Sequence, residues 1–220
     1  MELLEGIESR KSIRAFKATP IPRETLVRIL EVAGKSPSYT NTQPWEVVVV
    51  SGKKKDELSN ILYKLAESET KINPDLPTPR EWPSELDKRA KEHSARRFQA
   101  LGIGRENVQQ RKGFRLLNFK FYGAPSVLFL FIDRVLTSWS LFDAGLFSQS
   151  IVLAAHSLGL GTCLQASLVG YPDTVRDFLG IPKSKMLVLG ISVGYPDIEA
   201  PINKYQSTRV SSKEFTRWYD

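Results

Sequence analysis

Residues 127–132 read VLFLFI, and residues 141–158 read LFDAGLFSQSIVLAAHSL. The first run has the length and the residue types of a central strand. The second predicts a helix that is apolar on nearly every face, and such a helix is buried in a core or in a subunit interface. A monomer of 220 residues could hardly cover it, so we take the helix as a first indication of a dimer.

The other apolar patterns in the chain predict both helices and strands. Leu26, Ile29, Leu30 and Ala33 recur at helical spacing and predict a helix over residues 23–35. We expect further helices at 53–69, 81–100, 106–121 and 173–179, strands at 47–50 and 186–193, an extended segment at 162–168, and a proline-rich loop at 73–79. Residues 197–220 show no periodic core face, so this tail either frays or packs on a partner.

Length and composition indicate one ordinary domain over residues 1–220. No stretch approaches the roughly 20 apolar residues of a membrane span, and the N-terminus is charged where a signal peptide would be apolar. Cys163 is the only cysteine, which excludes an intrachain disulfide. We therefore expect a soluble, cytoplasmic protein without a membrane partner.

The formal charge of +7 is concentrated in one region, because residues 80–120 hold eleven Lys/Arg and five Asp/Glu, a local excess of +6. Such an excess attracts ligands that carry phosphate, or it marks a solvated helical face. No basic stripe interleaved with stacking aromatics is present, so we expect no nucleic-acid partner.

Two short segments have the chemistry of a binding site. Residues 9–14 read SRKSIR, and cations with hydroxyls can surround a phosphate, although surface runs of this composition are common. Residues 36–45 read SPSYTNTQPW, a rigid loop rich in hydrogen-bonding groups that either grips a polar heterocycle or caps a helix.

At this spacing the two segments closely resemble the signature of the FMN-dependent nitroreductase family. DAGLFSQSIVLAAHSLGLGTC at 143–163, GIPKSKMLVLGISVGYPD at 180–197 and STR at 207–209 match in the same order. The resemblance covers about residues 7–218 and is nearest to the nitrobenzoate reductase-like branch. That branch shares a charged helical insertion, here at about residues 71–115, which is either an active-site lid or structural.

The resemblance implies an α+β nitroreductase-like fold with a mixed central sheet flanked by helices, in an intertwined homodimer with FMN sites at the subunit interface. It also implies ping-pong, two-electron, oxygen-insensitive hydride transfer from transiently bound NAD(P)H through FMN to a small electron-poor acceptor, a nitroaromatic. Reductive dehalogenation, enone or quinone reduction, and a flavin-binding or electron-shuttling role remain open alternatives. The sequence identifies neither the physiological acceptor nor a preference between NADH and NADPH.

Carried over residue by residue, the resemblance assigns one set of residues to the cofactor and another to the substrate. FMN would be bound by Arg10, Ser12, Arg14 and Arg209 at its phosphate and ribityl end, by Gln165, Ala166, Ser167 and Lys120 around its ring, and by Pro37, Ser38, Tyr39, Asn41 and Gln43 from the other subunit. Lys11 is a further cofactor candidate, because it stands where some relatives have another residue in contact with the flavin. Tyr39, Trp82, Phe98 and Phe114 are candidates for substrate contact.

The pattern departs from the family at two positions. Tyr39 stands where glycine is common, and Ser207 stands where some relatives have lysine. FMN carries the chemistry itself, so we expect no catalytic side chain and no metal. We assign structural or solvated roles to His93 and His156.

Overall fold

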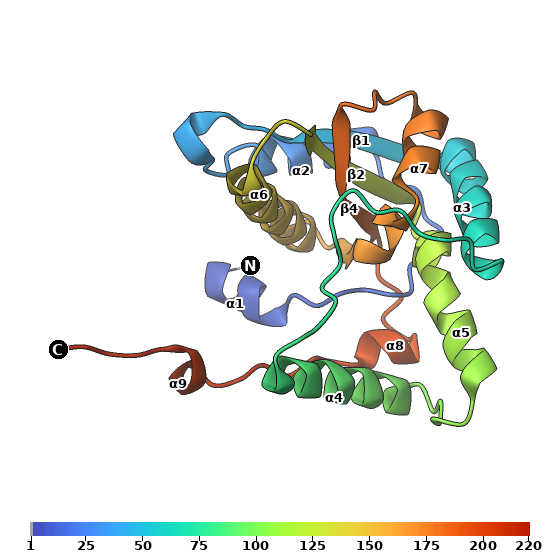
Figure 1. Cartoon of the computed structure of the whole chain (residues 1–220), viewed down its shortest axis with the longest axis vertical. Coiled ribbons are helices and arrows are strands. Elements are labelled where there is room, and N and C mark those ends of the chain that lie inside the picture. The colour runs from blue at the N-terminus through green and yellow to red at the C-terminus, as the bar shows by residue number, and fades with distance from the viewer. Residues whose placement is uncertain (1) are drawn as a thin grey trace.

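The computed structural model describes residues 2–220, and a four-stranded sheet lies at its centre (Figure 1). The strands are β1 (Glu46–Ser51), β2 (Ser126–Asp133), β3 (Gly161–Gln165) and β4 (Lys185–Gly194), in the order β1-β2-β4-β3. The α+β class is confirmed, but the predicted mixed sheet needs correction, because all neighbouring strands pair antiparallel. Among residues 2–220, parallel pairing is confined to an isolated bridge between Ser12 and Thr162. Strand direction depends on the path of long connections, which residue patterns do not encode.

β2 is buried on both faces because its apolar side chains alternate between two hydrophobic clusters. Leu128, Leu130 and Ile132 point toward one face of the sheet, and Val127 and Phe129 toward the other. An uninterrupted apolar run is what a strand with two covered faces requires. The predicted central strand at 127–132 is therefore confirmed.

Helices cover both faces of the sheet (Figure 1). α2 (Arg23–Ala33) and α6 (Ser138–Ser157) pack on the face of Leu128, whereas α3 (Gly52–Glu67) and α7 (Pro172–Leu179) pack on the face of Phe129. These four helices confirm the helical predictions for their segments. α6 is not fully covered by its own chain, because Trp139 and Phe142 near its start are 61% and 60% exposed.

The N-terminal segment runs from α1 (Leu3–Ser9) across β3. The backbone N–H of Ile13 donates to the carbonyl of Thr162 at 2.9 Å. A Cβ atom on Gly161 would lie 2.5 Å from Cγ1 of Ile13, so only glycine permits this approach. The contact holds residues 10–14 beside β3.

The charged insertion contains α4 (Ser84–Ala100) and α5 (Val108–Leu116), followed by the 3-10 helix η2 (Leu117–Gly123). The predicted helix at 106–121 is wrong at its end, because Phe121 and Tyr122 both have φ of 53°. Their burial, to 0% and 6% exposure, holds this left-handed turn. Phe98 and Phe114 join the insertion to the rest of the fold, because they form a hydrophobic cluster with Tyr122, Cys163 and Ile202.

The C-terminal segment begins on its own chain and then leaves it (Figure 1). In α8 (Pro201–Lys204), Asn203 is buried and its amide donates to the carbonyl of Ala15 at 2.8 Å. After α9 (Ser212–Phe215), Trp218 is 83% exposed.

The expected extended segment at 162–168 ends at Gln165, where the 3-10 helix η3 (Ala166–Gly170) begins.

Residues 2–220 contain neither a helix suited to span a membrane nor a cluster of metal-binding side chains. No described helix has the length and apolar character needed to cross a membrane. No group of three or more His, Cys, Asp and Glu side chains in the same part of the chain could hold a metal ion.

A buried ion pair anchors the loop that leads into α4. The carboxylate of Asp75 accepts hydrogen bonds from Arg176, from Arg134 at 2.8 Å and from the backbone N–H of Leu187 at 2.8 Å. The side chains of Asp75 and Arg176 are only 6% and 3% exposed. Burial alone would raise the pKa of Asp75, but these hydrogen bonds lower it below its usual value.

We expect Asp75→Asn to destabilise the protein by about 3 kcal/mol, because it leaves the buried Arg176 without its main counter-charge. Asp56→Asn, which removes an exposed partner of Lys55, is the matched control and should change stability by less than about 1 kcal/mol. The contribution of ionised Asp75 to the free energy of unfolding should be complete above about pH 4. It should be lost as the pH falls through the lowered pKa of Asp75 in the folded state. Urea unfolding at several pH values measures both effects, and equal midpoints for the two variants would contradict the assignment.

Candidate functional site

Two segments from opposite ends of the chain line a cationic cavity of about 740 Å³. The N-terminal wall consists of Arg10, Lys11, Ser12 and Arg14, and the C-terminal wall includes Ser207, Thr208 and Arg209. Asn203 fixes the N-terminal wall, because its Oδ1 accepts from the backbone N–H of Arg14 at 2.8 Å. The structure thus brings together the four residues that the sequence predicted for the FMN phosphate and ribityl end, and it places Lys11 beside them.

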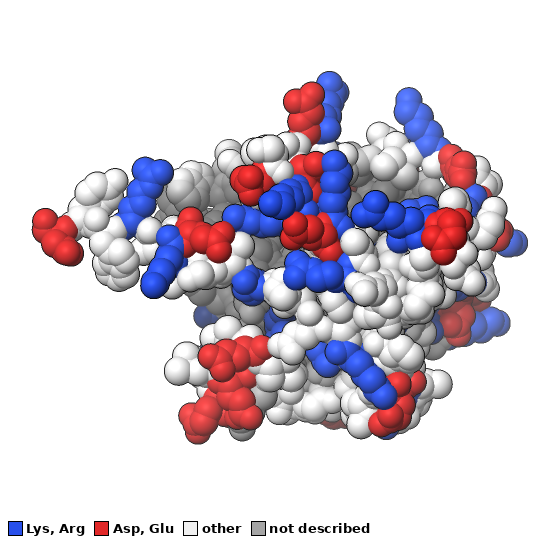
Figure 2. Space-filling view, turned by 90° about the horizontal axis from the view of Figure 1, so that it is seen from below, with Lys and Arg blue, Asp and Glu red and all other residues white. Residues whose placement is uncertain are grey.

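Helix α4 forms a further wall of the cationic cavity. Arg89, His93 and Arg96 line it from this helix. The hydroxyl of Tyr205 lies 3.0 Å from Nδ1 of His93 and joins α4 to the C-terminal segment. Figure 2 shows many Lys and Arg side chains, with carboxylates among them, on the face seen from below.

The charges around the cationic cavity are incompletely balanced. Burial, followed by the positive charge of Arg209, lowers the pKa of Arg10. Within the described chain, none of Arg10, Arg14 and Arg209 forms a salt bridge with a carboxylate. Guanidinium groups that converge without a carboxylate counter-charge favour an anionic ligand such as phosphate.

A second cavity, of about 270 Å³, lies beside the first and shares Arg14 with it. We call it the β3 cavity, because the end of β3 and the start of η3 line it. Its walls are Cys163, Leu164, Gln165, Ala166 and Ser167, with Arg97, Phe114, Arg115, Asn118 and Tyr122 opposite them or at the rim. The three residues predicted to contact the flavin near its reactive face therefore share one cavity.

Gln165 is held rigidly in the β3 cavity. Its Oε1 accepts from the hydroxyl of Ser192, and its Nε2 donates to the carbonyl of Asn118 at 3.0 Å. The residue is only 2% exposed. Both halves of the amide are thereby satisfied, which fixes the orientation of the side chain.

The polar loop at 36–45 lies at the start of α6 and lines neither cavity in this chain. Within it, the 3-10 helix η1 (Tyr39–Asn41) has left-handed residues, and the backbone N–H of Tyr39 donates to Oδ1 of the buried Asp143 at 3.1 Å. Oγ of Ser38 accepts from the backbone N–H of Gln43 at 2.9 Å. The Tyr39 ring is 62% exposed and stacks on Trp139.

The remaining sequence candidates lie in different surroundings. Nζ of Lys120 donates to Asn60 at 2.7 Å and lies over the ring of Tyr63, and the residue does not line the β3 cavity. Phe98 is a core residue, whereas Phe114 is mostly buried but reaches the β3 cavity. Trp82 is 53% exposed and lines neither cavity.

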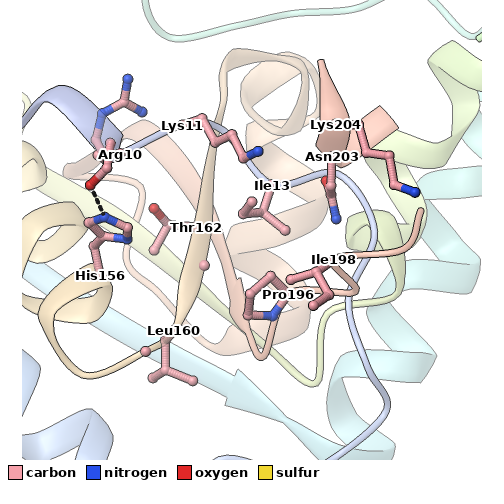
Figure 3. Close-up of a pocket in the computed structure, with 13 residues that line it drawn as sticks. Arg10, Lys11, Ile13, His156, Leu160, Thr162, Pro196, Ile198, Asn203 and Lys204 are labelled. Atoms are coloured by element: carbon pink, nitrogen blue, oxygen red, sulfur yellow. Dashed lines mark hydrogen bonds between the residues drawn. The ribbon is translucent and has the colours of Figure 1, made fainter. Parts of the chain in front are cut away.

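A smaller cavity of about 250 Å³ lies on another side of the N-terminal segment (Figure 3). Its lining includes the apolar side chains of Ile13, Leu160 and Ile198. Oγ of Ser9 lies 2.8 Å from Nε2 of His156 at its margin. Burial lowers the pKa of His156, and this contact with Ser9 agrees with the structural role expected for it.

Sequence reasoning missed the residues that the insertion brings to the two cavities. Arg97 and Arg115 of the insertion reach the β3 cavity, and His93 and Arg96 reach the cationic cavity. Asn118, which follows the insertion in η2, also lines the β3 cavity. The local charge excess at 80–120 was the available signal, but it could not separate cavity-lining cations from solvated ones.

Comparison with known proteins identifies the family of the chain. The model of the nitroreductase family matches residues 7–195. The nitroreductase NfnB of Mycolicibacterium smegmatis is 37% identical over 96% of this chain and 90% of its own length. A 4-nitrobenzoate reductase of Pseudomonas putida is 34% identical over 96% of this chain and 93% of its own length. The crystal structure of FMN-dependent NfnB from Mycobacterium smegmatis in complex with NADPH superimposes with a TM-score of 0.94, at 35% identity over 99% of this chain and 97% of that one. The chain therefore belongs to the nitroreductase family.

Proposed function

We propose that this chain is an FMN-dependent oxidoreductase that passes a hydride from NAD(P)H to a nitroaromatic acceptor. One observation carries the proposal. Arg10, Arg14 and Arg209 converge without carboxylate partners, next to a cavity lined by Gln165 and Ser167. Relatives described as an FMN-dependent nitroreductase and a 4-nitrobenzoate reductase, similar over nearly the whole chain, support it.

The residues present fit an FMN phosphate. Burial lowers the pKa of Arg10, and the positive charge of Arg209 lowers it further. A phosphate dianion between Arg10, Arg14 and Arg209 would offset both effects. The hydroxyl of Ser12, which also lines the cavity, can donate to a remaining phosphate oxygen.

The β3 cavity fits the other end of the cofactor. Gln165, Ala166 and Ser167 line it, and Nε of Arg97 at its wall is buried without a hydrogen-bond partner. Arg97 is therefore a better-placed cation for the ring or ribityl end than Lys120, which is engaged by Asn60. FMN supplies the hydride chemistry when bound, and the side chains bind and orient the reactants. Burial raises the pKa of Tyr122 and of Cys163, which keeps both groups neutral at the cavity wall.

A homodimer would complete this site. The loop from Pro37 to Gln43 lines neither cavity in its own chain, so it would reach the FMN of the partner subunit. Exposed aromatic side chains support an interface, namely Tyr39, Trp139, Phe142, Phe215, Trp218 and Tyr219.

The lining of the β3 cavity favours an acidic aromatic acceptor. Arg97 and Arg115 contribute positive charge, and no carboxylate side chain in the described residues lines this cavity. A nitrobenzoate would place its carboxylate near these cations, which supports a place in the branch of nitrobenzoate reductases.

The decisive measurement of function is the absorbance of the FMN-loaded protein under anaerobic conditions. We expect NADPH or NADH to bleach the flavin absorbance, and 4-nitrobenzoate to restore it. Bound FMN that neither nucleotide bleaches would favour an electron-shuttling or flavin-binding role instead.

Arg14→Ala and Arg209→Ala should each yield protein depleted of FMN, because a charge-assisted contact with phosphate contributes about 1.5–3 kcal/mol. Arg217→Ala removes an exposed arginine that lines neither cavity and serves as the matched control. The ratio of flavin to protein absorbance after purification measures the loss. Full flavin content in both cavity variants would refute the phosphate assignment.

Arg115→Gln should raise KM for 4-nitrobenzoate by about fivefold, because it removes a solvent-screened attraction to the carboxylate. KM for the neutral nitrobenzene should stay unchanged, which makes this substrate the internal control. Steady-state kinetics at low and high salt measure the effect. An equal change for both substrates would show that Arg115 shapes the cavity rather than binding a carboxylate.

A further inference from the structure

The inner face of α4 turns two arginines and a histidine toward the cationic cavity. Arg89, His93 and Arg96 lie at positions i, i+4 and i+7 and line the cavity together. Lys91 lies on the opposite face of the helix, where its side chain is 77% exposed and pairs with Asp87 at 2.6 Å. The helix therefore turns Arg89, His93 and Arg96 to the cavity and turns Lys91 to solvent.

The positive charges of three chain segments converge on His93. Burial lowers the pKa of His93, and the charges of Arg97, Arg14, Arg96 and Arg209 lower it further. Arg14 comes from the N-terminal segment and Arg209 from the C-terminal segment. The docked position of α4 therefore places cations close to the cations already gathered for a phosphate.

Two carboxylates line the cationic cavity, and each forms a long pair with an arginine of α4. Glu92 lies 3.9 Å from Arg96, and Glu214 lies 3.5 Å from Arg89 while it also accepts from the backbone N–H of Ser211 at 3.3 Å. Both ion pairs are partly exposed, and such pairs contribute little to stability. An anion in the cavity would balance the positive charges of Arg10, Arg14 and Arg209, which have no carboxylate partner in the described chain.

We propose that α4 is a clamp on the cofactor phosphate, in which His93 and Arg96 contact the FMN phosphate from the wall opposite Arg10, Arg14 and Arg209. The inference rests on the proposed function, since it requires FMN as the ligand. It gives the insertion a role in holding the cofactor, besides any role over the substrate. Because coupling between two equilibria is reciprocal, bound FMN also holds α4 in its docked position.

Riboflavin separates a phosphate contact from a general structural effect, because it carries the ring and the ribityl chain of FMN without the phosphate. Apoprotein is titrated with FMN and with riboflavin, for the wild type and for Arg96→Gln, His93→Gln and Lys91→Gln. We expect Arg96→Gln to raise Kd for FMN about tenfold and to leave Kd for riboflavin unchanged. His93→Gln should act in the same direction, and Lys91→Gln, the same charge change on the outer face, should match the wild type.

Limited proteolysis gives a second readout that does not depend on activity. FMN should slow cleavage between residues 80 and 107 in the wild type, and riboflavin should protect this segment less. Arg96→Gln should lose the difference between the two ligands. Thermal melting of the apoproteins identifies any variant that misfolds, and the Arg96 side chain, which is 46% exposed, should tolerate substitution.

Three outcomes would overturn the clamp. They are equal Kd values for FMN in Arg96→Gln, His93→Gln and the wild type, an equal loss of FMN and riboflavin affinity, and a rise in KM for NADPH relative to NADH with FMN affinity unchanged. The last outcome would assign α4 to the 2′-phosphate of the co-substrate. Wild-type protein that binds neither flavin would instead refute the proposed function itself.

Discussion

Burial of β2 on both faces is the constraint around which the fold is arranged. Leu128 and Phe129, adjacent in sequence, are each at most 1% exposed and belong to different clusters. Burial of apolar surface contributes about 25 cal/mol per Å², so a strand that is apolar from Val127 to Ile132 stabilises two layers at once. β4 pairs with β2, β3 pairs with β4, and the N-terminal segment lies on β3. The cationic and β3 cavities are thus built at the side of the sheet, on a rigid support.

That support makes it possible to hold like charges together. Side chains around the two cavities include Arg10, Arg14, Arg97 and Arg209, and their mutual repulsion opposes the arrangement. Contacts of another kind keep the segments in place. Phe98 and Phe114 pack α4 and α5 into a common cluster, and Asp75 ties the preceding loop to the sheet through Arg176. A phosphate-bearing cofactor then gains affinity from the charges that the fold has brought together.

The elements that the residue pattern predicted well are those with strong local signals. The helix predicted at 23–35 has apolar residues at helical spacing, and the run at 127–132 has the length and residue types of a strand. Both are confirmed, as α2 and β2. The end of the helix at 106–121 was misjudged, because burial of Phe121 and Tyr122 overrides helical propensity there. Antiparallel pairing throughout the sheet was also missed, since strand direction depends on contacts distant in sequence.

Ordered motifs and apolar patterns are local properties of the chain, so the sequence was enough to predict the family, the core strand and helices, and the residues that gather at the cationic cavity. The folded chain was needed to see that α4 brings His93 and Arg96 to that cavity and that Lys120 pairs with Asn60 instead of lining the β3 cavity. The direction of a long charged side chain depends on which segments pack beside it. That packing is set by contacts between residues far apart in sequence, and no local pattern encodes them.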